Sequence, residues 1–395
     1  MLDKINISKI RNILFYIAFT IELFVALVEK SDLYNPYESY IFRITFLITL
    51  LVIAITPYNL KEWIVVIAMN IMGLYCYIHT GRNDLWRMIV FVCACKAIDL
   101  EKALRYMFYV TLIGCLIIVG LSVFGIYGNA FVSAVYRAGE EETVRYCFGF
   151  GHANGLQTMM FVLTALWLYI YKGTTKLKNL AMYIVLLLVN YLVYMLTDSR
   201  TSFATTILVI GLMAMNCFFP NALKGYAYSV ISICLYVFSI VFSLWAAITA
   251  NKTWTDTTLQ YKVNSIINGR IMKLYFDSAK RRGWAGSWSL FSDDISTEYF
   301  DMGWVRLYYW YGIIPASIII FIIFMILLYC LIKKESDLAI LIASVAVYTI
   351  VEAHFVSDYI GRNYMLLIIG AFWSVSLLLA KGIGRYLLVI KSNKS

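Results

Sequence analysis

The chain has 395 residues, of which 62% are hydrophobic and only 14% are charged, and its formal net charge is +10. Ordinary globular domains carry roughly 25% charged residues, so this composition excludes a soluble or a disordered protein. The apolar residues come in long continuous runs, which excludes the short alternating segments of a membrane β-barrel. We therefore predict an all-α polytopic membrane protein, with residues 1–395 forming a single integral membrane domain.

Apolar runs of the length needed to cross a bilayer, about 20 residues, follow one another along the chain and predict about 12 transmembrane helices. They lie near residues 12–28, 40–56, 63–79, 86–98, 106–127, 153–171, 179–197, 203–219, 226–249, 304–332, 338–355 and 363–380. The run at 86–98 is short, which predicts a tilted, partly buried or re-entrant helix. One polar stretch, 250–303, is long enough to form a large structured loop.

Basic residues in the short loops indicate the orientation, because cytoplasmic loops are enriched in Lys and Arg. With the N-terminus inside, most of these residues are cytoplasmic, and the short outer loops carry only Lys30, Arg82, Arg87, Arg137, Arg145, Arg200 and Arg362. The pattern predicts that both termini are cytoplasmic and that 250–303 is extracytoplasmic. The positive charge is thereby assigned to topology and lipid headgroups, and it implies no nucleic acid partner.

The basic residues of the outer loops are almost entirely arginines, whereas those of the inner loops are mostly lysines. Arginine recognises phosphate and carboxylate groups through paired hydrogen bonds. This difference predicts an anion site on the outer face. The alternative is that these arginines pair with carboxylates of the protein.

Two outer segments carry polar residues at the ends of predicted spans. Phe148-Gly-Phe-Gly-His152-Ala-Asn154-Gly opens the span at 153–171, and its glycines would let backbone approach a ligand while helix amides receive an anion. The alternative is a glycine-rich turn with Asn154 near the helix cap. In the turn Thr197-Asp-Ser-Arg200-Thr-Ser, an arginine lies at a membrane boundary, where it needs a partner or a function. Asp198 is the structural candidate, and phosphate or sugar hydroxyls are the functional one.

The large loop contains Asn268-Gly269-Arg270 within apolar residues at near-helical spacing and several lysines. Such a pattern predicts an amphipathic helix on the outer leaflet. The loop ends at Asp301-Met-Gly303, with Arg306 about a turn and a half further on. A carboxylate at the rim of an apolar site can act as a general base; the alternative is that Asp301 caps the helix and pairs with Arg306.

The last outer turn holds Glu352, Arg362 and Asn363. Glu352 lies at the edge of an apolar span, where a carboxylate is costly and is therefore expected to have a partner or a function. The three histidines, His79, His152 and His354, are too dispersed for a metal centre, and the inner loops contain no nucleotide-binding motif. The sequence therefore predicts no metal and no cofactor.

Taken together, these segments resemble the bacterial O-antigen and capsular polysaccharide polymerases of the Wzy type and, more distantly, the O-antigen ligases. The resemblance covers about 148–315 and consists of the Phe-Gly-Phe-Gly-His-x-Asn motif, a Ser-Arg-Thr turn two spans later, a Gly-Arg in the external loop, and Asp-x-Gly leading to Gly-Ile-Ile. In the ligases a His and a small polar residue precede the last Gly-x-x-Gly. Here Asp301-Met302 takes that place and Pro315 replaces the final Gly, which favours a polymerase.

The resemblance implies a GT-C-like glycosyltransferase of the bacterial inner membrane that uses neither nucleotide nor metal. Such an enzyme transfers a growing O-antigen or capsule glycan from undecaprenyl diphosphate to a new lipid-linked repeat unit on the outer face. Undecaprenyl-diphosphate-linked oligosaccharides, membrane lipid, a flippase and a chain-length regulator are the implied partners. A ligase of finished glycan, as in lipopolysaccharide assembly, and a transporter of an anionic or lipid-linked glycan are the alternatives.

The resemblance also implies roles for individual residues. Arg200 and Arg270, supported by Arg306, would bind the diphosphate, and either Asp301 or Glu352 would activate the acceptor hydroxyl. The predicted catalytic residues are thus Asp301, Glu352, Arg200 and Arg270, and the predicted substrate-binding residues are His152, Asn154, Arg306, Arg362 and Asn363.

Overall fold

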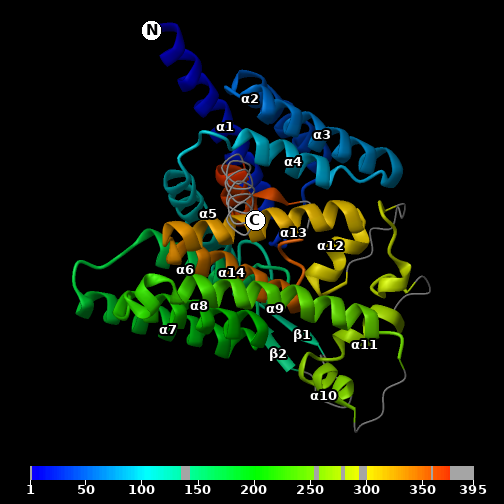
Figure 1. The fold of residues 1–395 in the computed structure, drawn as a ribbon. Coiled ribbons are helices and arrows are strands. Elements are labelled where there is room, and N and C mark those ends of the chain that lie inside the picture. The colour runs from blue at the N-terminus through cyan, green and yellow to red at the C-terminus, as the bar shows by residue number, and fades with distance from the viewer. Residues whose placement is uncertain are drawn as a thin grey trace, which may run out of the picture.

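The computed structural model describes residues 2–134, 143–252, 258–276, 281–292, 300–356 and 359–373. The chain forms a bundle of helices with one small β-hairpin (Figure 1). This confirms the all-α prediction, apart from the hairpin, which the apolar runs did not indicate. Arg137, the C-terminus and the last predicted span after Trp373 lie outside the described residues.

The elements follow one another in a simple order. The helices are α1 (Leu2–Glu29), α2 (Glu38–Ile55), α3 (Leu60–Thr80), α4 (Asp84–Ala94), α5 (Leu100–Val123), α6 (Ala153–Ile170), α7 (Lys176–Thr197), α8 (Arg200–Phe218), α9 (Ala227–Thr249), α10 (Leu259–Ile266), α11 (Arg270–Phe276), α12 (Gly303–Tyr311), α13 (Ile313–Lys333), α14 (Ser336–Val351) and a last helix over Tyr364–Trp373. The antiparallel strands are β1 (Phe131–Ala134) and β2 (Thr143–Tyr146), and the short 3-10 turns are η1 (Ala222–Gly225), η2 (Ala285–Ser287) and η3 (Ile360–Arg362).

Within the described residues, nine helices are long and apolar enough to cross a membrane, namely α1, α2, α3, α5, α6, α7, α8, α9 and α13. The chain is therefore a multi-pass membrane protein. Three of the twelve predicted spans fall short of that length where they are described: α4, α14 and Tyr364–Trp373. The brevity of α4, with 11 residues, agrees with the short apolar run predicted there.

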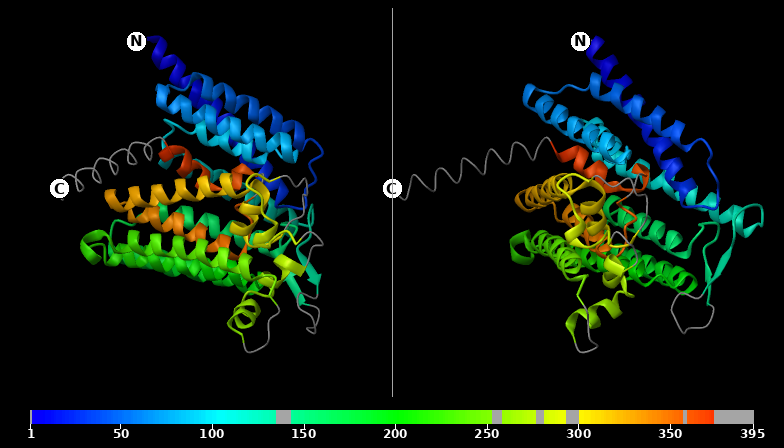
Figure 2. Two further views of the ribbon diagram at one scale, coloured as in Figure 1. Left: turned by 45° about the vertical axis from the view of Figure 1, so that its right-hand side comes forward. Right: turned by 90° about the vertical axis from the view of Figure 1, so that its right-hand side faces the viewer.

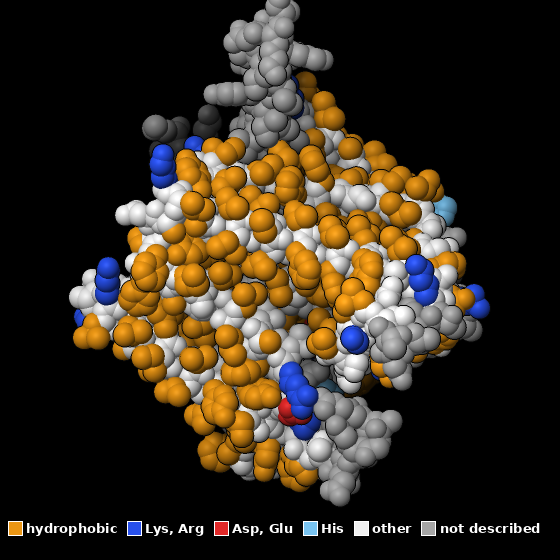
Figure 3. Space-filling view, turned by 60° about the horizontal axis from the view of Figure 1, so that its bottom comes forward, with side chains coloured by type: hydrophobic (Ala, Val, Ile, Leu, Met, Phe, Trp, Pro, Cys, Tyr) orange, Lys and Arg blue, Asp and Glu red, His pale blue; other side chains and the backbone are white. Residues whose placement is uncertain are grey.

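Many large apolar side chains lie exposed on the outside of the bundle. On α3 the side chains of Ile64, Ile67 and Ile71 are 53–62% exposed, and Figure 3 shows a broad face covered with hydrophobic side chains, around which most of the visible Lys and Arg side chains lie. Helix α14, in contrast, is buried around nearly its whole circumference. A helix that is apolar all round belongs in a protein core, and the residue that follows α14, Glu352, is buried as well, at 4% exposure for the whole residue.

The predicted span at 304–332 is divided into two helices. Gly312, at φ 94°, separates α12 from α13. A Cβ atom at this position would lie 2.5 Å from the Cα atom of Phe291, so only glycine fits against the loop there. The division turns α12 away from the axis of α13 and lets the loop pack into the bend.

The predicted outer segments gather at one end of the bundle (Figure 2). At that end lie the hairpin, helices α10 and α11, and the start of α12. The connections predicted as cytoplasmic meet at the opposite end, where Lys172 pairs with Asp337 and Lys334 donates to the carbonyl of Lys224 (3.0 Å). The structure thus separates the two groups of loops as the charge pattern predicts.

Within the stretch predicted as a large loop, 250–303, the described residues 258–276 and 281–292 include α10, α11 and η2. Helix α11 buries Ile271 and Leu274 against the end of α9 and against Met302 and Val305. The other apolar side chains of α11, Met272 and Phe276, are 37% and 57% exposed, and Ile266 on α10 is 82% exposed. Helix α11 thus packs on the protein through one face and exposes apolar side chains on another, and contact of this segment with the outer leaflet stays a prediction.

Candidate active site

The Asn268-Gly269-Arg270 motif forms a tight turn that starts α11. Asn268 and Gly269 both have positive φ, at 58° and 77°, a conformation that glycine and asparagine adopt most readily. The buried side chain of Asn264 holds this turn, since its Oδ1 accepts hydrogen bonds from the backbone N–H groups of Ile271 and Met272, both at 3.0 Å. The first residue of the helix, Arg270, is thereby fixed in position.

Replacing Asn264 by alanine is expected to loosen α11. The change leaves two amides without their acceptor, at a cost of about 1–3 kcal/mol, so the 270–276 amides should exchange hydrogen faster than in the unaltered protein. Mass-spectrometric hydrogen exchange on protein in detergent measures this effect. Asn221→Ala is the matched control, because Asn221 is exposed and makes no side-chain cap bond; equal protection of α11 in both variants would contradict this role.

The Asp301-Met302-Gly303 segment packs onto the end of α14. Met302 has a φ of 71°, and its N–H lies 3.3 Å from the carbonyl oxygen of Val351. A Cβ atom on Gly303 would lie 2.6 Å from Cγ2 of Thr349 and 2.9 Å from the carbonyl oxygen of Glu352. Glycine in this motif therefore brings Asp301 beside Glu352.

Gly303→Ala is expected to push α12 away from α14. Overpacking of this kind costs about 1–3 kcal/mol, so the midpoint of thermal unfolding in detergent should fall. The control is Gly120→Ala in α5, where an added Cβ meets nothing within 4 Å and should be neutral or stabilising. A Gly303→Ala protein as stable as Gly120→Ala would refute the close packing.

Three of the four predicted catalytic residues meet in one cluster. Arg270 Nε lies 3.0 Å from Asp301 Oδ2, and Arg270 Nη2 lies 2.6 Å from Glu352 Oε1. Glu352 is 5% exposed, Arg270 is 15% exposed and Asp301 is 38% exposed. The arginine thus joins a carboxylate inside the protein to one at the rim, and it is Arg270, on the large loop, that pairs with Asp301.

The environment of Glu352 disfavours its charged form. Burial and the nearby Asp301 carboxylate raise the pKa of Glu352 to about 7, against the opposing effect of Arg270. His354 Nε2 lies 3.6 Å from Glu352 Oε2. Burial, followed by the positive charges of Lys30, Arg362 and Arg306, holds the pKa of His354 well below its usual range, so this imidazole is neutral at pH 7. A carboxyl group with a pKa near 7 suits proton transfer at neutral pH.

Lys30 belongs to the site although the sequence analysis assigned it only to topology. Its side chain is 14% exposed, and burial together with Arg362 lowers its pKa to about 8. Its ammonium group is close enough to influence the pKa values of both Glu352 and His354. One signal could have found it, because Lys30 is the single lysine among the basic residues of the short outer loops.

The glycine-rich motif before α6 packs against residues 30–32, which follow α1. The N–H of Asp32 donates to the carbonyl of Gly149 (2.9 Å), and a Cβ atom on Gly155 would lie 3.7 Å from Cδ of Lys30. The close approach that these glycines permit is therefore used by residues 30–32 of the protein itself. This packing brings the ammonium group of Lys30 to the N-terminus of α6.

The two predicted binding residues of this motif have structural contacts. His152 caps α6, because its Nδ1 accepts from the N–H of Asn154 (3.1 Å). Oδ1 of Asn154 accepts from Nη2 of Arg145 (3.1 Å), while Nε of Arg145 donates to the carbonyl of Thr197 (2.5 Å). Arg145 on β2 thus ties the start of α6 to the end of α7, and the structural alternative accounts for Asn154.

Arg200 and Asn363 are also held by local contacts. The side chain of Arg200 is 62% exposed and pairs with Asp198 at 3.5 Å. Asn363 donates to the carbonyl of Phe355 (2.9 Å) and accepts from the N–H of Met365 (3.0 Å), so it caps the last helix. The structure therefore does not bring Arg200 into the Arg270 cluster, and a direct substrate contact for either residue stays a prediction.

Arg306 and Arg362 are buried, at 1% and 4% exposure. The guanidinium of Arg306 lies 3.5 Å from the ring of Trp310, which Arg82 also contacts at 3.4 Å. Nη1 of Arg362 pairs with Glu29 Oε2 at 3.0 Å. Both arginines influence the pKa of His354, so they add positive potential behind the cluster.

The described part of the chain contains no group of three or more His, Cys, Asp or Glu residues that could hold a metal ion. The positive charge of the site comes from the side chains around Glu352. Comparisons of the chain with protein-family models, curated proteins and solved structures found no match.

Proposed function

We propose that the chain is a bacterial polysaccharide polymerase of the O-antigen or capsule type. It transfers a glycan from undecaprenyl diphosphate to a hydroxyl group of a new lipid-linked repeat unit. The observation that carries the proposal is the bridge from Arg270 to Asp301 and Glu352, within a cationic environment at one end of a membrane bundle. The proposed substrate follows from the resemblance of four sequence motifs to those of the Wzy-type polymerases.

The residues of the cluster have complementary roles in this reaction. A bond forms between the acceptor oxygen and the anomeric carbon, the bond from that carbon to the diphosphate breaks, and the acceptor proton passes to Glu352. We favour Glu352 over Asp301 as the general base because it is buried and has a pKa near 7. Asp301 at the rim orients Arg270.

Arg270 stabilises the negative charge that develops on the leaving diphosphate. A guanidinium has five N–H donors, and the two ion pairs engage Nε and Nη2, so donors remain for phosphate oxygens. Fixed donors aimed at developing charge are the largest single contribution in many enzymes. Lys30, Arg306 and Arg362 support the anion through their charge.

The proposed setting is the bacterial inner membrane, with a GT-C-like arrangement. The lysine-rich end and both termini are in the cytoplasm, and the Arg270 end faces outward, where flipped lipid-linked repeat units arrive. A flippase and a chain-length regulator are the proposed protein partners. The distribution of Lys and Arg between the two ends supports this orientation.

Reconstitution tests the proposal. Purified protein in vesicles, given an undecaprenyl-diphosphate-linked repeat unit without nucleotide or metal, is expected to produce a ladder of longer lipid-linked glycans. Arg270→Ala protein at equal abundance is the control and should leave single repeats. Passage of the substrate across the vesicle without lengthening would overturn the proposal in favour of a transporter. Transfer only to a different lipid or protein acceptor would overturn it in favour of a ligase.

A further inference from the structure

An apolar cavity of about 170 Å³ lies inside the bundle between two layers of helices. One wall is formed by α3 and α4, with Met69, Met88 and Ile89, and the other by α13, α14 and the last helix, with Ile319 and Leu366 among its residues. The cavity is recessed between the helices and partly open to the outside, in contrast to the apolar side chains that lie fully on the surface. Apolar cavities stay free of water and take apolar ligands.

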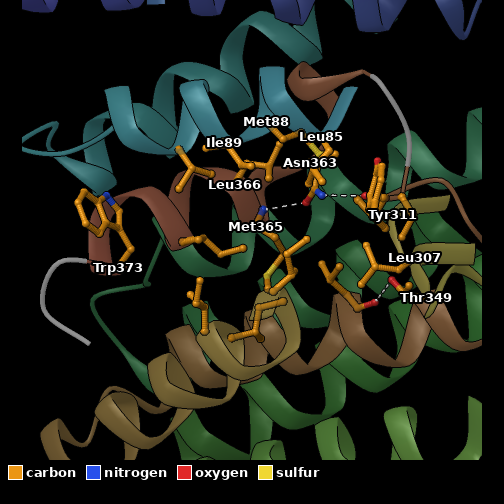
Figure 4. Close-up of a pocket in the computed structure, with 18 of the residues that line it drawn as sticks. Leu85, Met88, Ile89, Leu307, Tyr311, Thr349, Asn363, Met365, Leu366 and Trp373 are labelled. Carbon is orange, nitrogen blue, oxygen red and sulfur yellow. Dashed lines mark hydrogen bonds between the residues drawn. The ribbon is translucent and has the colours of Figure 1, made fainter. Parts of the chain in front are cut away.

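The two ends of this cavity differ. Figure 4 shows Tyr311, Thr349 and Asn363 toward one end and Trp373 at the other. The polar end adjoins the candidate active site, because Thr349 packs on Gly303, and Gly303 in turn contacts the carbonyl of Glu352. Asn363 is the neighbour of Arg362. The apolar end runs along the helices and away from the charged cluster.

The cavity is lined by side chains that adapt to an irregular chain. Four methionines contribute to it, Met69, Met72, Met88 and Met365. Methionine is unbranched and flexible, and it is common at surfaces that accommodate varied apolar ligands. A ligand whose chemistry matches both the cavity and the neighbouring charged cluster is an amphiphile, with an anionic head group and a hydrocarbon chain.

We propose that this cavity binds the hydrocarbon chain of the lipid diphosphate donor, over the stretch nearest the diphosphate. The proposal rests on the proposed function and extends it, because it assigns part of the donor specificity to the lipid chain. The remainder of the chain continues into the bilayer. Recognition of the chain places the anomeric carbon at the cluster whichever sugar it carries.

Filling the cavity from either wall tests the proposal. Met88→Trp on α4 and Ile319→Trp on α13 both insert a large ring, and Met195→Trp is the matched control, since Met195 is 63% exposed on α7. The probes are two synthetic donors with the same sugar diphosphate, one on a farnesyl chain and one on an ethyl group. Because each buried CH₂ contributes substantially to binding, wild-type kcat/KM should favour the farnesyl donor by at least about tenfold.

In the two filled variants this preference should fall to about one, because the inserted ring occupies the space proposed for the farnesyl chain, whereas Met195→Trp should keep the wild-type preference. A farnesyl preference that persists in both variants would overturn the cavity assignment and leave the polymerase intact. A wild-type protein that transfers sugar from neither donor would contradict the proposed function instead. The two failures are therefore distinguishable.

If a variant does not fold, photolabelling of the unaltered protein tests whether the cavity binds the hydrocarbon chain. A farnesyl diphosphate with a photoreactive group on its chain should label the segments around Met69–Met72 and Ile319–Ile323, and undecaprenyl diphosphate should compete. Labelling confined to the outer faces of α3 or α7 would overturn the proposal. Competition by phosphatidylglycerol, and not by undecaprenyl diphosphate, would assign the cavity to a bulk lipid and overturn it as well.

Discussion

Replacing Arg270 by alanine is expected to reduce polymer formation by at least about 100-fold, with single repeat units accumulating. Removing one preorganised donor to a developing anion costs about 10²–10³-fold in rate. The change also leaves Asp301 and the buried Glu352 facing each other without the cation between them. Two unbalanced carboxylates favour protonation of Glu352, which removes the proposed base as well. Gel analysis of lipid-linked glycans, at matched protein levels in membranes, measures the effect.

Two other arginines serve as controls for this result. Arg105→Ala removes a 40% exposed arginine that pairs with Glu101 within α5, and such surface pairs contribute about 0–1 kcal/mol. Arg200→Ala removes an exposed arginine beside Asp198, so we expect a loss well below that of Arg270→Ala. Arg270→Lys should recover part of the activity, because it keeps the charge but not the planar fork. Normal chain lengths in Arg270→Ala would exclude the proposed role.

Replacing Glu352 by glutamine is expected to lower the rate by about 10²–10⁴-fold, the usual contribution of a general base, and to abolish the pH dependence of the remaining rate below pH 7. The pKa of this carboxyl is about 7, so the carboxylate is the minor form below pH 7. The wild-type rate should therefore fall about tenfold per pH unit below 7, level off just above it, and decline again above about 8, where Lys30 loses its charge. Rates at saturating substrate from pH 5.5 to 9 provide the profile.

Asp301→Asn is the matched comparison for this experiment. Asp301 is 38% exposed, and its proposed task is to orient Arg270, so the variant should be slower but keep the rise through pH 7. The opposite result, in which Glu352→Gln retains the wild-type profile and Asp301→Asn loses it, would assign the base to Asp301. Glutamine keeps an oxygen that can accept from Arg270, so a general loss of fold is not expected in Glu352→Gln.

The sequence identified the members of the cluster by an argument about cost. A charged side chain in so apolar a chain needs a partner or a function, and this argument selected Arg270, Asp301 and Glu352. Their contact was not predictable, because 31 and 82 residues separate Arg270 from its two partners. This contact depends on how α11 packs on α9 and how Gly303 packs on α14. The periodicity of apolar residues predicts neither of these packing contacts.

The same argument was less informative where a residue had two adequate explanations. Lys30 was counted only as one of the few basic residues of the outer loops, so its burial beside α6 was not predicted. Arg200 was predicted to be functional, although Asp198 is a sufficient partner. The number of spans was also difficult to predict. The sequence of α14 resembles that of a membrane span because it is apolar on every side. A helix of 16 residues in a protein core has the same composition.

The pairing of Glu29 with Arg362 joins residues 333 positions apart, and Gly361 sits directly on the backbone of Glu22 and Leu23 in α1. The ribosome synthesises α1 long before η3. Glu29, at the C-terminal end of α1, therefore has no Arg362 partner during most of translation. The charged site is consequently assembled last, when the final outer turn is laid against α1. A partly inserted chain therefore lacks the contact between Glu29 and Arg362 and has no complete charged site.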